Sequence, residues 1–233
     1  MKPDISVFFP AYNEEENIPW VVEKACNFLD DIAREYEVIV VNDGSRDSTG
    51  EVAERLTKEK KNIRVIHHPV NRGYGAAVSS GLKGSRYELI FFTDGDGQFD
   101  ITELSGFLPL INDFDVVAGY RMKRKDPFYR LINAWAYGTM INLLFGLNIR
   151  DIDCAFKLLK KSVIQEIDIE ATGALASAEL LIKIKKKGYK IIQKGVNHYP
   201  RKAGVQTGAQ LWVVMRMFKE LWKLRKKLLN SEE

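Results

Sequence analysis

Two aspartates near the middle of the chain, Asp94 and Asp96, are the residues whose types and spacing most clearly suggest chemistry. They follow the apolar run 89–92, which predicts a buried strand, and the glycines at 95 and 97 leave room for a ligand to approach the backbone. Two carboxylates this close repel each other unless a cation neutralises them or one binds a proton. Mg²⁺ and Mn²⁺ prefer oxygen ligands, and Mg²⁺ often completes its shell with water and substrate phosphates. The pair therefore predicts a divalent-metal site for a phosphorylated ligand.

A calcium-binding loop is the first alternative for this stretch. Such a loop needs a glycine at its sixth position and a glutamate at its twelfth, and counting from Asp94 gives Phe99 and Ser105. This alternative is excluded. An ordinary polar turn after a strand stays open for these residues taken alone, because Asp-Gly pairs are common in turns.

The elements that must position the two aspartates alternate between strands and helices. Predicted strands cover residues 5–9, 38–41, 63–67 and 89–92, and predicted helices cover 18–33, 48–60 and 75–83. Such alternation indicates βαβ units and a mostly parallel sheet flanked by helices, in which ligands bind beyond the carboxyl ends of the strands. Polar residues follow each predicted strand, so we expect four loops to meet at one edge as a nucleotide site. These residues are 10–14, Asp43, Asn71 and 94–98.

Glycine motifs for phosphate add little to this signal. Gly73-Tyr74-Gly75 half matches the dinucleotide fingerprint, but Val78 takes the place of its third small residue and the motif follows the third strand instead of the first. The small residues more simply let a helix pack closely on the sheet and offer its N-terminus to an anion. The chain has no G-x-x-x-x-G-K-[ST] sequence, which excludes the P-loop class.

The second half of the chain predicts further elements and a basic end. We expect a helix over 101–110, a strand over 116–118, an apolar helix over 131–147, a helix over 175–187 and two short strands over 190–193 and 196–199. The apolar helix has about the minimum length for a membrane span, but Asn133, Gly138 and Asn142 favour a position against the protein or in the membrane interface.

Residues 208–229 predict an amphipathic helix with Trp212 and Trp222 on one face and a lysine-rich opposite face. From Lys194 to Leu229 there are nine Lys and Arg residues and one acid, Glu220. This pattern is typical of a helix that lies on a membrane surface, and equally of a helix that packs its apolar face on the core.

Composition limits the class of protein. The chain has 233 residues, 45% hydrophobic and 28% charged, which is enough for one substantial core, and its net charge of +4 is too small by itself to imply a nucleic-acid partner. Cys26 and Cys154 are isolated from any metal-binding spacing, which favours a reduced cytoplasmic setting without structural zinc. The first residues lack the apolar stretch of a signal peptide, so we expect a protein that is not exported. Oligomeric state stays open.

Four ordered motifs resemble those of the family 2 glycosyltransferases with a GT-A fold, and in particular the polyprenyl-phosphate glycosyltransferases among them. The motifs are Pro10-Ala11-Tyr12-Asn13-Glu14, Asn42-Asp43-Gly44-Ser45, Asn71-Arg72-Gly73 and Asp94-Gly95-Asp96-Gly97-Gln98. The resemblance extends over nearly the whole chain and implies a single α/β domain. Its nucleotide-sugar half would cover about residues 1–100, its acceptor half about 101–207, and the basic helix about 208–229.

The resemblance implies a role for each candidate residue. Pro10, Ala11, Tyr12, Glu14 and Asp43 would hold the nucleoside of a nucleotide-sugar, and Asp94 would help to bind this donor. Asp94, Asp96 and Gln98 would hold Mg²⁺ or Mn²⁺ against the donor diphosphate. Arg121, Arg130 and Arg201 would bind an acceptor phosphate, and Asp96, Arg121 and Arg201 would be the catalytic residues. The chain departs from the family pattern at Asn42, where the first of two aspartates is usual, and in ending without the paired transmembrane helices of some relatives.

The implied activity is inverting transfer of a hexose, mannose or glucose, from a GDP- or UDP-linked sugar to a polyprenyl (dolichyl) phosphate at the cytoplasmic face of a membrane. A phosphate acceptor is already ionised, whereas a hydroxyl acceptor needs a general base. Glu179, Asp151 and Asp153 are the candidate bases for that alternative. A nucleotide-sugar-binding module without activity is a second alternative, and the intact carboxylate pair argues against it.

Overall fold

The structure is a computed structural model that describes residues 2–122, 128–173, 175–201, 203, 221 and 226, with the backbone alone for 128–131. The described residues form one seven-stranded sheet in the order β3-β2-β1-β4-β6-β5-β7, in which β6 alone runs antiparallel to its neighbours. The strands are β1 (Asp4–Ala11), β2 (Glu35–Asn42), β3 (Ile63–His67), β4 (Leu89–Phe92), β5 (Val116–Met122), β6 (Lys157–Lys160) and β7 (Ile191–Asn197). The α-helices are α1 (Ile18–Ile32), α2 (Thr49–Glu59), α3 (Tyr74–Gly84), α4 (Phe128–Phe145), α5 (Lys161–Gln165) and α6 (Leu175–Lys186).

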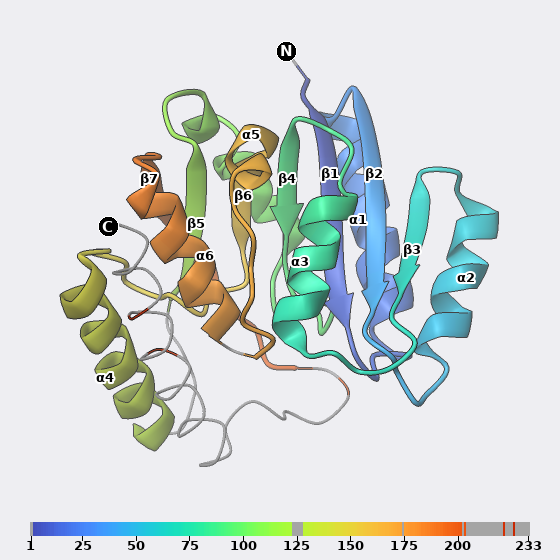
Figure 1. Ribbon diagram of the computed structural model, residues 1–233. Helices are drawn as coiled ribbons and strands as arrows, with labels where there is room; N and C mark the ends of the chain where they lie inside the picture. The colour runs from blue at the N-terminus through green and yellow to red at the C-terminus, as the bar shows by residue number, and fades with distance from the viewer. Residues whose placement is uncertain are drawn as a thin grey trace.

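Side chains on alternate positions of the strands face two different helical layers. In β1, Ile5, Val7 and Phe9 pack with α1 and α2, whereas Phe8 points to the other face and packs with α3 and α6. Figure 1 shows α3 and α6 in front of the sheet and α1 behind it. Because both faces are covered, the central strands β1, β2 and β4 carry runs of buried apolar residues, as expected for a parallel sheet in an α/β protein.

A third group of buried side chains joins α4 and α6 beyond β5. Tyr137 and Ile141 of α4 contact this group, and so does Leu221 from the end of the chain. Lys226 is exposed. The predicted basic helix over 208–229 otherwise lies outside the described residues.

The structure confirms the predicted α/β class and corrects three elements. The stretch 101–110 forms two short 3-10 helices, η1 (Ile101–Gly106) and η2 (Leu110–Asn112), instead of one α-helix. The two strands predicted over 190–193 and 196–199 are the single strand β7, in which Gly195 pairs with Tyr120 of β5. Strand β6 was not predicted, because it has only four residues and begins and ends with lysine.

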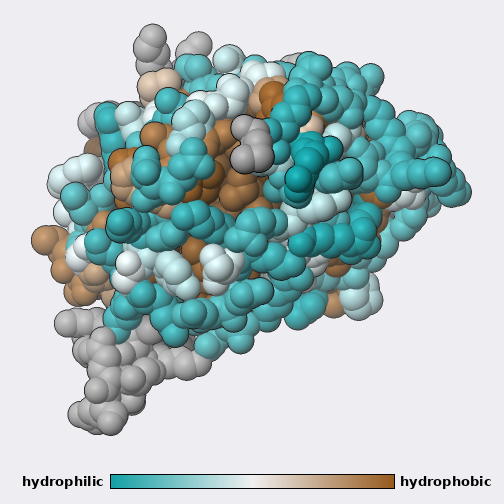
Figure 2. Space-filling view, turned by 90° about the horizontal axis from the view of Figure 1, so that it is seen from above, coloured by the Kyte–Doolittle hydropathy of each residue, from teal (hydrophilic) through white to brown (hydrophobic). Residues whose placement is uncertain are grey.

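The candidate site lies at one end of the sheet. Figure 2 shows the other, upper end of the molecule, where β1 begins; hydrophilic side chains cover most of its surface and surround a group of hydrophobic ones. The polar loops predicted to form a site follow the carboxyl ends of β1 to β4 at the opposite end. Among the described residues, none of the helices combines the length and the apolar character that crossing a membrane requires.

Candidate active site

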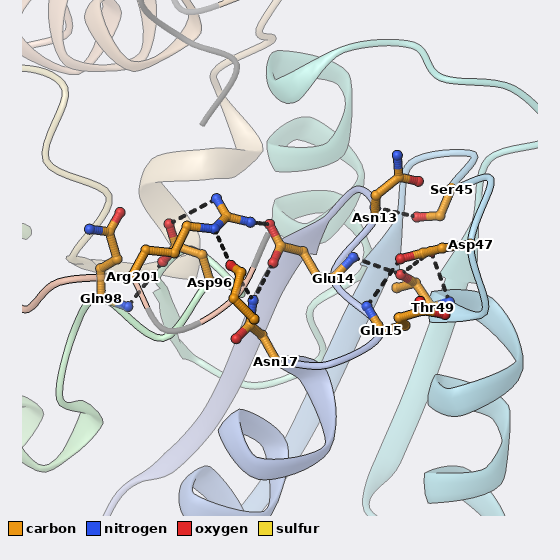
Figure 3. A network of polar contacts seen from close by, with 11 residues as sticks. Asn13, Glu14, Glu15, Asn17, Ser45, Asp47, Thr49, Asp96, Gln98 and Arg201 are labelled. Atoms are coloured by element: carbon orange, nitrogen blue, oxygen red, sulfur yellow. Dashed lines mark hydrogen bonds and ion pairs between the residues drawn. The ribbon is translucent and has the colours of Figure 1, made fainter. Parts of the chain in front are cut away.

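The loops after β1 and β2 are held to each other by a ladder of hydrogen bonds between backbone and side chains. The backbone N–H of Asn13 donates to Ser45 Oγ (3.0 Å), and that of Glu14 donates to Thr49 Oγ1 (2.8 Å). Arg46 N–H donates back to Asn13 Oδ1 (2.8 Å). Asn13 has a φ of 56°, a left-handed conformation that asparagine tolerates better than most residues. Figure 3 shows the Asn13–Ser45 and Glu14–Thr49 contacts on one side of the network.

The first candidate residues contribute mainly through the backbone. Pro10 and Ala11 are buried at the end of β1; Pro10 O accepts a hydrogen bond from Gly95 N–H (3.4 Å), and Ala11 O accepts one from Asp43 N–H (2.9 Å). Tyr12 is half-buried. These bonds place the loops after β1, β2 and β4 side by side, as the sequence predicts.

Asp43 anchors the loop that follows β3. Its buried carboxylate accepts hydrogen bonds from the backbone N–H groups of Arg72 (2.9 Å) and Gly73 (2.8 Å) and contacts Nδ1 of the buried His68 (2.6 Å). His68 Nε2 lies 2.9 Å from Ser80 Oγ in α3. Direct contact of Asp43 with a nucleoside stays a prediction; in the structure, this carboxylate positions the loop 71–73 beside the site.

The two aspartates after β4 sit in a low-dielectric environment. Burial, followed by the nearby Asp96 carboxylate, raises the pKa of Asp94 to about 7, while a hydrogen bond from Tyr74 opposes this shift. Burial also raises the pKa of Asp96, whose Oδ1 accepts a hydrogen bond from Gln98 N–H (3.0 Å). The fold therefore holds two buried carboxylates together at a cost in free energy that a bound cation would offset.

The donor atoms at this position fit a hard divalent cation. Within the part of the chain that the structure describes, no group of three or more His, Cys, Asp or Glu side chains could hold a metal ion. Asp94 and Asp96 would thus depend on the Gln98 amide and on a ligand's phosphates, which is the arrangement Mg²⁺ commonly uses. The amide nitrogen of Gln98 donates to Tyr199 O (3.0 Å), so its oxygen is the end that suits a metal.

Arg201, which follows β7 in the second half of the chain, contacts the loops after β1 and β4 in the first half. Its Nη2 donates to Glu14 Oε1, and its Nη1 lies 3.7 Å from Asp96 Oδ2. Asn17 Nδ2 donates to the other Glu14 oxygen (2.7 Å), and burial raises the pKa of Glu14. In Figure 3, Arg201 lies between Glu14 and Asp96. The structure thus brings together three of the predicted site residues that are far apart in the sequence.

Arg121, at the end of β5, is held by Asp151. Its Nε and Nη2 donate to the two Asp151 oxygens at 2.7 and 2.8 Å, and its backbone N–H donates to Oδ2 (3.1 Å). Burial opposes the charge of Arg121, but Asp151 outweighs burial and raises its pKa. The Arg121 charge also lowers the pKa of Asp94. Arg130 lies in the first turn of α4, where side chains are outside the described part, so its role stays a prediction.

Three further residues at the site escaped the sequence analysis. Lys157, fully buried at the start of β6, donates to Ile152 O (3.3 Å) and to Cys154 O, and its charge lowers the pKa of Asp94. Tyr74 donates to Asp94, and His198 lowers the pKa of Asp96. His198 directly follows β7, so predicting this strand as one piece would have placed His198 at the carboxyl end of a strand, where site residues are expected. The position of Lys157 at the site could not be predicted in this way, because the sequence does not indicate that β6 pairs with β4.

Fold and site together define an α/β protein with a pair of buried carboxylates after one of its parallel strands. Comparison with known proteins identifies its family. Solved structures of glucosyl-3-phosphoglycerate synthase from Mycobacterium tuberculosis share its GT-A fold. One of them, in complex with Mn²⁺, UDP and phosphoglyceric acid, has a TM-score of 0.72 at 19% identity and covers 96% of this chain and 78% of that one. Residues 6–168 match the sequence profile of glycosyl transferase family 2. The chain belongs to this family.

Curated relatives include enzymes named for polyprenyl-phosphate substrates. A dolichyl-phosphate beta-glucosyltransferase of Trichomonas vaginalis is 32% identical over 172 residues, covering 67% of this chain and 53% of its own length. The human dolichyl-phosphate beta-glucosyltransferase is 32% identical over 177 residues, covering 67% and 55%. Polyprenol monophosphomannose synthase of Mycolicibacterium smegmatis is 28% identical over 236 residues, covering 95% and 88%. The chain spans about half the length of the first curated relatives it matches.

Proposed function

We propose that this protein is an inverting, metal-dependent hexosyltransferase that moves a sugar from a nucleotide-sugar to a polyprenyl phosphate. The observation that carries the proposal is the contact of Arg201 with Glu14 and Asp96. It sets a guanidinium, which binds phosphate bidentately, directly beside the carboxylates that suit a metal and a donor diphosphate. The names of the relatives in glycosyl transferase family 2 support a polyprenyl-phosphate acceptor.

In this proposal, different residues of the site bind two anions, the donor diphosphate and the acceptor phosphate. Asp94, Asp96 and Gln98 would hold Mg²⁺ or Mn²⁺, and a metal bound there would supply positive charge to the leaving nucleoside diphosphate. Arg201 and Arg121 hold the acceptor phosphate in line with the anomeric carbon, so that one displacement inverts its configuration. The loops after β1, β2 and β3 fix the nucleoside. The main contribution of the protein is therefore position and charge.

Transfer to a hydroxyl acceptor is less favoured because its general base would come from residues with other tasks. Asp151 is bound to Arg121 through both oxygens, and Glu179 accepts backbone hydrogen bonds inside the protein. Burial lowers the pKa of Lys157, and the charge of the nearby Asp153 opposes this shift. A phosphate acceptor needs no base, since it is ionised at neutral pH.

Helix α4 supports contact with a membrane surface. Its side chains Ile132, Trp135 and Leu143 are 46%, 70% and 81% exposed, and the sequence has no charged residue from 131 to 149. Large apolar side chains exposed along a helix are typical of an interfacial helix. We propose that α4 and the basic segment 208–229 bind the cytoplasmic face of the membrane, where the lipid acceptor would be presented.

Transfer of radiolabel from GDP-mannose and, separately, from UDP-glucose into an organic-extractable polyprenyl phosphate tests the proposal. We expect label in the organic phase with one of the two donors, and loss of this label when EDTA removes divalent metal. Donor turnover with label in a water-soluble glycan would support the hydroxyl-acceptor alternative. Binding of donor without turnover would favour the inactive module.

A further inference from the structure

Glu179, in the first half of α6, is buried, and its carboxylate is enclosed by donors from its own half of the protein. Its side chain is 2% exposed. Oε2 accepts hydrogen bonds from the backbone N–H groups of Glu170 (3.0 Å) and Ala171 (2.7 Å), and Oε1 lies 2.6 Å from Lys183 Nζ. The carboxylate therefore fixes the path of the backbone at residues 170 and 171, and Lys183 balances its charge.

The backbone fixed by Glu179 packs on the start of α3. Gly75 N–H donates to Thr172 O (2.9 Å). A Cβ added at Gly75 would lie 1.9 Å from Ala171 O, and one added at Gly73 would lie 2.3 Å from Thr172 O. Such distances are impossible for real atoms, so both glycines are required by this contact. The φ of Gly73, 94°, is a second reason for glycine there.

The contact continues to the loop beside the candidate nucleoside site. Gly73 N–H and Arg72 N–H donate to Asp43, which His68 also contacts. The loop 71–75 is thus held on one side by Asp43 and on the other by the segment 170–172. Hydrogen bonds, joined by the short backbone segments 170–172 and 72–75, connect the Glu179 carboxylate in the second half of the chain with Asp43 in the first.

We propose that Glu179 is a positioning residue for the nucleotide donor, which acts by holding the segment 170–172 against the loop 71–75. The inference rests on the proposed function, because it assigns this loop to the donor site. It differs from the role of general base, in which the carboxylate would have to face an acceptor hydroxyl. The loss of this carboxylate should weaken nucleotide binding and leave the chemical step largely unchanged.

The variant E179Q tests this role with little change in size. An amide has one acceptor oxygen where three donors need partners, it turns an N–H₂ towards backbone N–H groups, and it leaves Lys183 without its closest counter-charge. We expect the Kd for UDP or GDP in the presence of Mn²⁺, measured by calorimetry, to rise about tenfold. The matched control E166Q changes an exposed glutamate that lies 3.5 Å from Lys187 in the same half of the protein, and should bind as the wild type does.

Gly75→Ala approaches the same contact from the other side and serves as the test if E179Q does not fold. The added methyl group would push Ala171 away, so we expect a similar rise in Kd. The double variant should be weaker than wild type by much less than the product of the two single effects, because both changes break one contact. Circular dichroism and thermal unfolding check that each variant is folded.

Kinetics separate a positioning residue from a base. For E179Q, we expect the donor KM to rise with kcat within about threefold of wild type and the pH profile of kcat unchanged. A folded E179Q with wild-type nucleotide Kd overturns the proposal, and so does a loss of kcat of about a hundredfold or more with unchanged Kd, which indicates a base. If wild-type protein binds neither nucleotide, the proposed function fails together with the inference.

Discussion

The proposed donor side and the proposed acceptor side of the site are held in different ways. On the donor side, backbone N–H groups bind side chains of neighbouring loops, as where Glu14 binds Thr49 and Gly73 binds Asp43. On the acceptor side, charged side chains bind carboxylates, as where Arg121 binds Asp151. Backbone contacts fix a loop whether or not ligand is present, whereas an arginine bound to a carboxylate is one that a phosphate can also bind. We infer that the donor side is preorganised and that Arg201, which contacts Glu14 and Asp96, connects the two sides.

Replacement of Asp96, which lies where the two sides meet, should have the largest effect on the rate of sugar transfer. Asp96→Ala removes a proposed metal ligand and one partner of Arg201, and we expect transfer to fall by at least about a thousandfold. The fold should be kept, because the change also removes repulsion from Asp94. Initial rates and circular dichroism measure the two effects, with exposed Asp113→Ala as the control. Turnover close to wild type would remove the metal role of Asp96.

Replacement of Arg201 should have the next largest effect on sugar transfer. In Arg201→Ala, we expect kcat/KM for the polyprenyl phosphate to fall about a hundredfold, while the Kd for nucleotide changes little. Arg201→Lys should recover only part of the loss, since an ammonium cannot bind phosphate through two parallel hydrogen bonds. If nucleotide binding fell and acceptor kinetics did not, Arg201 would belong to the donor side alone.

Asp151→Asn sharpens the assignment of Arg121. The variant leaves a largely buried guanidinium without its carboxylate, so the free energy of unfolding should fall by about 3 kcal/mol. Transfer should fall less than in Arg201→Ala, about tenfold, because Arg121 stays near the site but loses its fixed orientation. Denaturant unfolding and initial rates test both parts. An Asp151→Asn variant with wild-type stability and full activity would show that the Arg121–Asp151 ion pair is needed neither for stability nor for transfer.

Replacement of Asp115 should have the smallest effect on sugar transfer, because this residue lies in the acceptor half but far from the site. The backbone N–H of Lys190, aided by Lys160, holds the pKa of Asp115 below its usual range despite partial burial. A lowered pKa in the folded state adds stability above the usual pKa of about 4, and this stability is lost as pH falls through the lower folded value. Wild type should therefore exceed Asp115→Asn in stability at pH 7, and the two should converge in acid. Transfer rates should be equal, and a large loss of activity in the variant would contradict the separation of fold and site in this half.

The sequence predicts the donor side better than the acceptor side for a physical reason. Strands β1 to β4 are rich in apolar and β-branched residues and are followed by polar motifs, so their existence and the meeting of their loops can be predicted from local patterns. The acceptor side depends on contacts between distant residues. Arg201 binds Glu14 across 187 positions, and no local pattern indicates that pairing.

Local patterns also misled where tertiary contacts decide the structure. Asp100 caps η1 through Thr102 N–H (3.0 Å), and Gly106 with Pro109 interrupts what looks like one α-helix. Lys157 appears polar in the sequence but is fully buried between β4 and β5. Glu179 reads as an acid near a helix start that could serve as a base, and its buried contacts with residues 170 and 171 appear only in the folded chain.

Two acceptors that differ only in their phosphate would show whether the protein uses a phosphate acceptor. With the preferred donor and Mn²⁺ in excess, transfer is measured to a polyprenyl phosphate and to the polyprenol of the same length in the same detergent. We expect transfer to the phosphate alone, and loss of this transfer in Arg201→Ala. Equal or faster transfer to the alcohol would contradict this expectation, since the site would then need a general base and not a pair of phosphate-binding arginines.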